Sequence, residues 1–156
     1  QKKINSNNLD EKNQSLSLAR KINSNPLIYY PDGLKAAAIR FKNSLQENAK
    51  IHAMAEDVIE ACHNGIVSWE EKNHVKPILI EGEDDHIKTK ERWLILKEFF
   101  ELNSVEYIEI KSVKGGILSK IINLIYLLDY TSIYLAILRK TNPTTITAIE
   151  FVKDKM

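Results

Sequence analysis

Three short apolar stretches, separated by stretches with helical spacing, limit this chain to a small set of folds. Residues 27–30 and 76–80 are mostly apolar, and residues 105–110 alternate between apolar and polar side chains. Short apolar strands in alternation with helices indicate a parallel sheet that helices cover on both faces. The sequence therefore predicts an α/β fold: a three-layer α-β-α sandwich with a mostly parallel, doubly wound sheet of the flavodoxin-like kind.

Helices are expected between these strands. From Leu34 to Lys50 the apolar residues recur on one side and the polar residues on the other. A second helical stretch is predicted over 53–62, a third from the acidic turn 81–85 to residue 102, and a long one from Gly116 to Leu138.

The two ends of the chain have different patterns. Residues 1–25 are rich in Asn, Ser and Lys and carry a weak apolar series, which predicts a linker with one lead-in helix, so the folded domain is placed at 26–156. Over 144–153 a last helix is predicted, with Thr144 as its cap and with Ile146, Ile149 and Val152 facing inward.

Composition excludes several partners. The chain has 156 residues, enough for one core, and 22 Lys and Arg residues against 21 Asp and Glu give a net charge of +1. This balance predicts binding neither to nucleic acid nor to an anionic membrane. The apolar run 121–138 is long enough to span a bilayer, but Asn123 and Asp129 interrupt it, which favours a buried helix. The single cysteine and the polar first residues favour a cytoplasmic location.

Two places in the sequence could carry chemistry, although each more often has a structural role. The polar face Arg40, Asn43, Glu47 and Lys50 sets a carboxylate among cations and amides, a pattern that is also typical of a solvated helix face. His63 stands at a break in the pattern, where a histidine is usually bonded to backbone. Periodicity by itself selects neither Glu47 nor His63.

Metal and nucleophile chemistry are not favoured. The histidines show no spacing that would join two or three of them into a metal site with Cys62, so we expect no metal and no cofactor. Cys62 precedes His63, but adjacent helical residues point in different directions, and packing in the core is the expected role of this cysteine. No glycine-rich phosphate cradle of the usual pattern is present.

Three motifs, in order, resemble the bacterial and archaeal bifunctional phosphoglucose/phosphomannose isomerases, which are built from two sugar-isomerase (SIS) domains. Residues 40–43 and 46–50 read RFKN and QENAK, similar to the family's RWKN and NENAK. Residues 60–69 read EACHNGIVSW, similar to its PELxHNEIVGW stretch. Residues 128–136 and 142–144 read LDYTSIYLA and NPT, similar to its closing DYxSxYLA and DPT pattern. The likeness covers the chain from Asn25 onward and is to the C-terminal SIS domain.

The resemblance implies an activity and assigns residues to it. The family interconverts glucose 6-phosphate or mannose 6-phosphate with fructose 6-phosphate through an enediol, without a metal, and its catalytic glutamate and histidine match Glu47 and His63. Arg40, in the first motif, is a candidate substrate-binding residue. Thr131, also a candidate substrate-binding residue, aligns with a threonine that in some members is associated with accepting both C2 epimers of the sugar. The family's substrate-contacting lysine falls near Arg139 and Lys140. Gly65 stands where the family has an acidic residue after His-Asn.

The resemblance also implies partners. In the family a loop of the N-terminal SIS domain holds the phosphate, so residues 1–25 are expected to link this chain to such a domain. The family's histidine reaches across a homodimer, which predicts that His63 serves the site of a second copy. Two other functions stay open: a phosphosugar-binding SIS module without catalysis, and a dimerisation domain.

Overall fold

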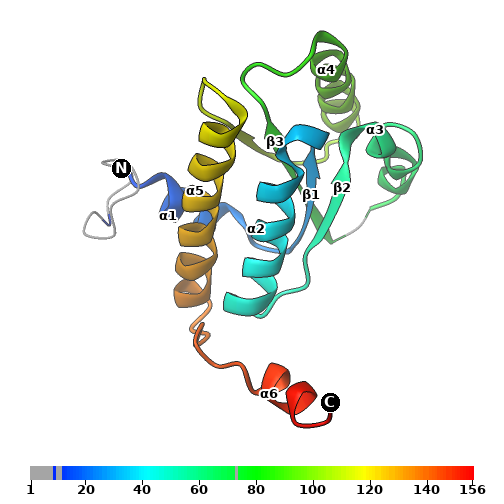
Figure 1. Ribbon diagram of the computed structural model, residues 1–156. Coiled ribbons are helices and arrows are strands. Elements are labelled where there is room, and N and C mark those ends of the chain that lie inside the picture. The colour runs from blue at the N-terminus through cyan, green and yellow to red at the C-terminus, as the bar shows by residue number, and fades with distance from the viewer. Residues whose placement is uncertain (1–8, 10–11, 73) are drawn as a thin grey trace.

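The computed structural model describes residue 9 and residues 12–72 and 74–156. Its elements alternate along the chain (Figure 1). In order they are α1 (Gln14–Lys21), β1 (Asn25–Tyr30), η1 (Asp32–Leu34), α2 (Lys35–Asn48), β2 (Met54–Asp57), α3 (Val58–Ala61), η2 (Gly65–Trp69), β3 (Val75–Glu81), α4 (Ile87–Leu102), β4 (Ile108–Lys111), α5 (Ile117–Leu138) and α6 (Thr147–Lys153), where η marks a 3-10 helix.

The four strands form one sheet in the order β2-β1-β3-β4, and every pair is parallel. Leu27 of β1 lies opposite Met54 on one side and Pro77 on the other. The chain starts in the middle of the sheet, moves to one edge and then to the other, as in doubly wound folds. The predicted α/β fold with a parallel sheet is confirmed.

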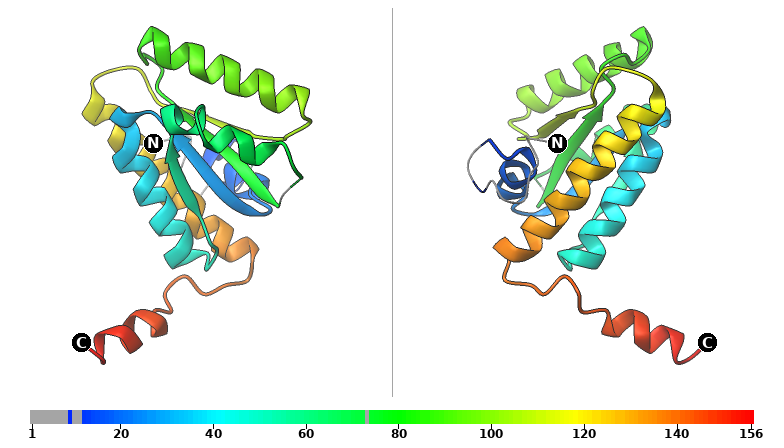
Figure 2. Two further views of the ribbon diagram at one scale, coloured as in Figure 1. Left: turned by 90° about the vertical axis from the view of Figure 1, so that its right-hand side faces the viewer. Right: turned by 60° about the vertical axis from the view of Figure 1, so that its left-hand side comes forward.

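Helices cover both faces of this sheet. Successive side chains of a strand point to opposite faces, so Ile28 and Tyr30 of β1 pack with α1, α2 and α5, whereas Tyr29 packs with α3, η2 and α4. Within the first layer α5 contacts both α1 and α2 (Figures 1 and 2). The result is the three-layer sandwich that the sequence predicts.

The apolar run 121–138 lies within α5. By length and composition α5 could cross a membrane, with a mean hydropathy of 1.7 over its most apolar window. One side of the helix is buried against α1, α2 and the sheet, and that side includes Leu124, Leu128 and Leu135. These contacts are those of a core helix in a folded domain.

The helix predicted over 53–62 is wrong in its first half. Residues 54–57 form β2, the edge strand beside β1, and only Val58–Ala61 are helical. As an edge strand, β2 keeps its side chains at least partly exposed, so its sequence Met-Ala-Glu-Asp does not need to alternate between apolar and polar residues. The strand pattern used for the prediction is therefore missing here. Asp57 then ends the strand and caps α3, with Oδ1 accepting from the Ile59 N–H at 2.8 Å.

The last helix also differs from its prediction. It begins at Thr147 without a side-chain cap, and the Thr144 N–H and hydroxyl both donate to Asn142 Oδ1 before the helix starts. None of its residues is buried, so the expected inward face at Ile149 and Val152 is wrong. Figures 1 and 2 show α6 at the end of a linker, extending away from the sandwich, so it does not pack on the sheet.

The lead-in helix of the first 25 residues is α1, and it packs on the sandwich. Its Leu16 and Leu18 are buried, and so is Ile22 just after it. The Ser15 hydroxyl donates to the Leu127 carbonyl of α5 at 2.8 Å. This helix therefore belongs to the first core layer.

Candidate active site

Two of the sequence motifs meet across the contact between α2 and α5. Arg40 of α2 donates from Nε to both carboxylate oxygens of Asp129 on α5, at 3.1 and 2.9 Å, and from Nη2 to Oδ2 at 2.7 Å. Such a fork fixes the plane of the guanidinium. The hydrogen bonds and the charge of Asp129 raise the pKa of Arg40, and the charge of nearby Glu47 adds to the effect.

Further polar pairs continue this contact along the helices. The Ser44 hydroxyl also donates to Asp129 Oδ1, at 2.9 Å, and Asn48 Nδ2 donates to the Ser132 hydroxyl at 2.8 Å. Arg40, Ser44 and Asn48 are each four residues apart, so they lie on one stripe of α2. The first and third motifs of the sequence are thus two halves of one interface.

Glu47 lies beside this stripe, near the carboxyl end of α2, and is exposed. It lines two adjacent cavities. One, of about 600 Å³, lies between α2 and α5 and includes Arg40, Asn43, Asp129 and Ile133. The other, of about 400 Å³, lies between the end of α2 and the start of α6. Asn43 lines both cavities with Glu47, so a ligand in either one would meet the same carboxylate and amide.

Lys50 joins the end of α2 to the segment before α6. Its Nζ donates to the carbonyl of Glu47 and, at 2.6 Å, to the carbonyl of Thr145. A cation at a helix carboxyl end is favoured by the helix dipole. Lys50 therefore forms part of the wall of the second cavity, which Thr145, Ile146 and Ile149 complete.

His63 lies far from Glu47 in the same chain. The helix α2 ends at the amino edge of the sheet, β2 then runs to the carboxyl edge, and His63 follows α3 there. β2 by itself spans about 13 Å at the usual rise per residue. His63 is exposed, and its backbone N–H donates to the Glu60 carbonyl at 3.0 Å. One copy of the chain does not bring the two candidate catalytic residues together.

The turn after His63 is shaped by a carboxylate from β2. A methyl group on Gly65 would lie 2.8 Å from Oε2 of Glu56, so Glu56 occupies the space that a side chain at position 65 would need. Burial raises the pKa of the Glu56 carboxyl, and the charges of Glu60 and Asp57 raise it further. The Glu56 carboxylate therefore lies directly beside the turn at Gly65.

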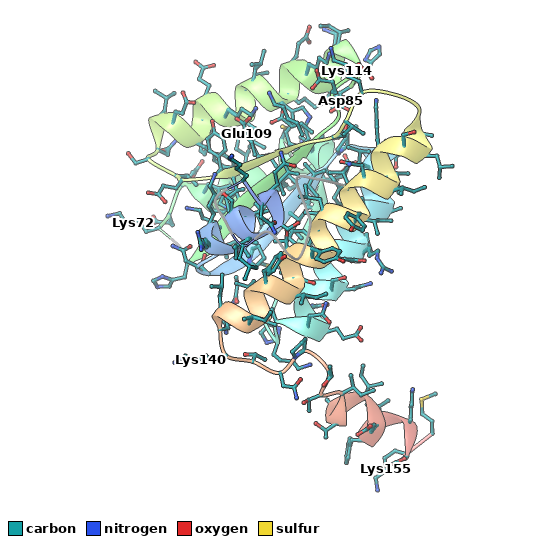
Figure 3. The ribbon with its side chains drawn as sticks, turned by 90° about the vertical axis from the view of Figure 1, so that its left-hand side faces the viewer. Lys72, Asp85, Glu109, Lys114, Lys140 and Lys155 are labelled. Carbon is teal, nitrogen blue, oxygen red and sulfur yellow. The ribbon has the colours of Figure 1, made fainter. Side chains whose placement is uncertain are left out.

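The other predicted substrate contacts lie elsewhere. Thr131 is fully buried, and its hydroxyl donates to the Leu127 carbonyl at 2.8 Å, so it lines neither cavity. Arg139 caps α5, and Lys140 follows with a positive φ of 56°; both are exposed. Figure 3 shows Lys140 at the turn after α5, at the same end of the molecule as the end of α2. Neither residue lines the two cavities around Glu47.

The carboxyl edge of the sheet, where doubly wound folds usually bind their ligands, is acidic here. The turn after β3 contains Glu83, Asp84 and Asp85, and Figure 3 shows Asp85 near Lys114 at this edge. Asp85 Oδ2 accepts from the Gly82 N–H at 2.9 Å and from Trp93 Nε1 at 3.1 Å. The Asp85 carboxylate therefore already binds the Gly82 N–H of this turn.

Nucleophile and metal chemistry find little support in the described residues. Cys62 is half-buried, and burial raises the pKa of its thiol, which lowers its nucleophilicity near neutral pH. Within the described part of the chain no group of three His, Cys, Asp or Glu side chains could hold a metal ion.

Sequence reasoning missed two parts of this site. Asp129 was noted as a polar residue in the apolar run and as part of the closing motif, but not as a site residue, and the start of α6 was assigned to the core. Both could have been found from the motifs, since Asn142-Pro143-Thr144 ends just before the residues that line the second cavity. Spacing by itself carries no such signal, because the partner of Arg40 is 89 residues away.

Comparison with known proteins gives a consistent result. The family model described as "Bacterial phospho-glucose isomerase C-terminal SIS domain" matches residues 11–156. A bifunctional phosphoglucose/phosphomannose isomerase of Caldicellulosiruptor bescii is 31% identical in an alignment of 153 positions that covers 94% of this chain and 45% of that protein. One of Aquifex aeolicus is 29% identical over 84% of this chain and 42% of its own length. The chain thus spans less than half the length of these curated relatives.

Solved structures share the fold at low sequence identity. A glucose-6-phosphate isomerase like protein of Thermus thermophilus has a TM-score of 0.64 at 20% identity, over 85% of this chain and 44% of that one. The tagatose-6-phosphate ketose/aldose isomerase of Escherichia coli also has a TM-score of 0.64, at 11% identity, over 86% of this chain and 42% of that one.

Proposed function

Since this chain belongs to the bacterial phospho-glucose isomerase C-terminal SIS domain family, we propose that it is the C-terminal half of a sugar-phosphate aldose–ketose isomerase. The substrates are glucose 6-phosphate and mannose 6-phosphate, interconverted with fructose 6-phosphate through an enediol intermediate. The single observation that carries this proposal is the meeting of two family motifs around the Glu47 carboxylate and its two cavities.

The reaction moves a proton between C1 and C2 of the open-chain sugar, so it needs one base near both carbons and donors near the two oxygens. Glu47 is that base. Asn43 borders both cavities with Glu47, and Arg40 is held beside it by Asp129. These side chains supply an amide and a cation that would stabilise negative charge on the enediolate. Arg139 and Lys140, at the same end of the molecule, are proposed substrate contacts once the rest of the protein is present. Thr131, which is fully buried, is not proposed as one.

His63 is proposed to open the sugar ring by moving a proton at O5, in the active site of a second copy. The positions of Glu47 and His63 at opposite edges of the sheet support this, because a histidine on the same copy is too far away. A homodimer would then complete two sites at once.

The phosphate is proposed to be held by an N-terminal SIS domain that precedes Gln1. Residues 1–25 are proposed as linker and lead-in helix, the helix being packed on the C-terminal domain of residues 26–156. The turn after β3 supports this division of roles, because Lys114 and Lys120 at this edge are already paired with Glu83 and Asp84, at 3.8 and 3.1 Å. We therefore expect little turnover from these 156 residues alone. Central sugar metabolism in the cytoplasm is the proposed setting.

The test is an assay of full-length protein for conversion of fructose 6-phosphate to glucose 6-phosphate, with chelator present, beside its Glu47→Gln variant. We expect the variant to lose most of its rate and to keep its oligomeric state. Glu98→Gln removes the same charge at an exposed position of α4, on the other face of the sheet; it is the matched control and should stay active. Binding of the sugar phosphate without turnover in the parent would favour a sensing module, and a dimer without binding would favour a dimerisation domain.

A further inference from the structure

The outward side of α5 carries a stripe of apolar side chains that the described residues leave uncovered. Leu118, Ile122, Tyr126, Ile133 and Ile137 have exposed fractions between 39% and 67%. Their spacing of four, four, seven and four residues keeps them within about 100° of arc on one helix face. This α5 stripe is about 28 Å long at the helical rise.

Such a stripe indicates an interface. Single exposed apolar residues are common on monomers, but five on one face of a helix usually mark a binding surface. The opposite side of α5 is already used by the core, where Leu124, Leu128 and Leu135 are buried. The helix is therefore apolar on two sides, as expected of an element placed between two packed bodies.

The chain enters the domain beside this stripe. Asn13 Nδ2 donates to the Tyr134 hydroxyl of α5 at 3.1 Å, and Ser15 is bonded to the α5 backbone. Figures 1 and 2 show α1 packed alongside α5, with the start of the described chain next to it. A body joined ahead of α1 is therefore connected to the domain on the α5 side.

The stripe is also continuous with the candidate active site. Ile133 belongs to the stripe and lines the cavity between α2 and α5 together with Glu47 and Arg40. A body seated on the stripe would form the missing wall of that cavity. It would also remove water from around Glu47, which is exposed in this chain.

From these four observations we propose that the α5 stripe is the docking surface for the half of the protein that precedes Gln1. The curated relatives are more than twice as long as this chain, which leaves room for a body of similar size. This inference rests on the proposed function for the existence of that half, and it names the surface on which the half packs.

The test measures accessibility of the stripe to a maleimide reagent. Ile122→Cys and, as a second position, Leu118→Cys are made in a Cys62→Ala background, in full-length protein and in the 156-residue chain. Labelling is read at each position by peptide mass spectrometry. Leu94→Cys, on α4 at the opposite face and exposed like Leu118, is the matched control.

We expect both stripe positions to label at least about tenfold more slowly in the full-length protein than in the 156-residue chain, as buried positions do. Leu94→Cys should label equally fast in both. Equal rates at the stripe positions in both proteins would overturn the proposal.

Two other results would also overturn it and identify another occupant. Protection in the 156-residue chain that increases with its concentration would mean that a second copy covers the stripe. Protection that requires phosphatidylglycerol vesicles would mean a membrane surface. The isomerase assay separates this inference from the proposed function. Protection of the stripe in a full-length protein without isomerase activity would support the docking surface but not the function. Isomerase activity without protection would support the function but contradict the docking surface.

Discussion

Arg40 and Asp129, 89 residues apart in the sequence, form a forked ion pair that holds α2 to α5 next to Glu47. The pair is partly exposed, with 56% of the Arg40 side chain and 25% of the Asp129 side chain accessible. Exposed pairs contribute little to stability. Its position suggests that it orients the cation beside the candidate base.

Asp129→Asn should therefore affect activity more than stability. We expect the free energy of unfolding to fall by about 1 kcal/mol or less, and kcat of the full-length isomerase to fall about tenfold or more, because the guanidinium is no longer fixed. Chemical denaturation and the coupled assay measure the two effects. Glu106→Gln removes the partner of Lys76 in another exposed pair, at 2.7 Å, and should leave kcat unchanged. Equal effects of the two variants on kcat would contradict a positioning role for Asp129.

Removal of residues 147–156 should lower activity without lowering the stability of the domain. The helix α6 buries none of its residues, so the melting temperature should change by less than about 2 °C. Activity of the full-length protein should fall strongly, because Thr147, Ala148 and Ile149 line the second cavity around Glu47. Removal of residues 154–156 alone is the control. A large loss of thermal stability in the longer truncation would mean that α6 packs on the domain after all.

Tyr29→Phe should destabilise the second core layer. The buried Trp69 Nε1 donates to the Tyr29 hydroxyl at 2.8 Å, and an unpaired buried donor costs about 1–3 kcal/mol. Urea denaturation at neutral pH measures this loss.

The same variant makes a prediction about alkaline pH. Burial raises the pKa of Tyr29 from 10.0 to about 12, so the folded state holds this proton more tightly than the unfolded state. The contribution of this pKa shift to the free energy of unfolding is fully present below pH 10 and is lost as the pH rises towards 12. The difference in stability between the wild type and Tyr29→Phe should therefore narrow above pH 10. A constant difference would contradict the shifted pKa.

Glu56→Gln should stabilise the protein at neutral pH. Burial and the charges of Glu60 and Asp57 raise the pKa of this carboxyl above its ordinary 4.5, so the folded state favours the protonated form. The wild type then loses stability as the pH rises above 4.5, and glutamine, which stays neutral, does not.

The measurement is the melting temperature of both proteins near pH 4 and near pH 8. A gain at the higher pH that disappears at the lower pH is expected. Glu98→Gln, at an exposed position of α4, removes the same charge away from this cluster and is the control. A gain of the same size at both pH values would show that charge on Glu56 is not the cause.

Local pattern was enough for most of the fold. The strands β1 and β3 were predicted from short apolar runs, α2 from apolar residues that recur on one side, and α5 from a long apolar run. The edge strand β2 was missed, since it pairs on one side only and has no such period. The helix α6 was predicted to pack on the core because it contains regularly spaced apolar residues, but these residues are exposed in the structure.

By itself, then, the sequence determined the alternation of strands and helices and, through three motifs, the family. The tertiary structure alone decided that Arg40 pairs with Asp129, that Asn48 is hydrogen-bonded to Ser132, and that Thr131 lies on the buried side of α5. It also set Glu47 and His63 at opposite edges of the sheet. The physical reason is that helix periodicity shows which face is buried but not against what, and the packing of α2 on α5 arises only when the sheet brings the two helices together.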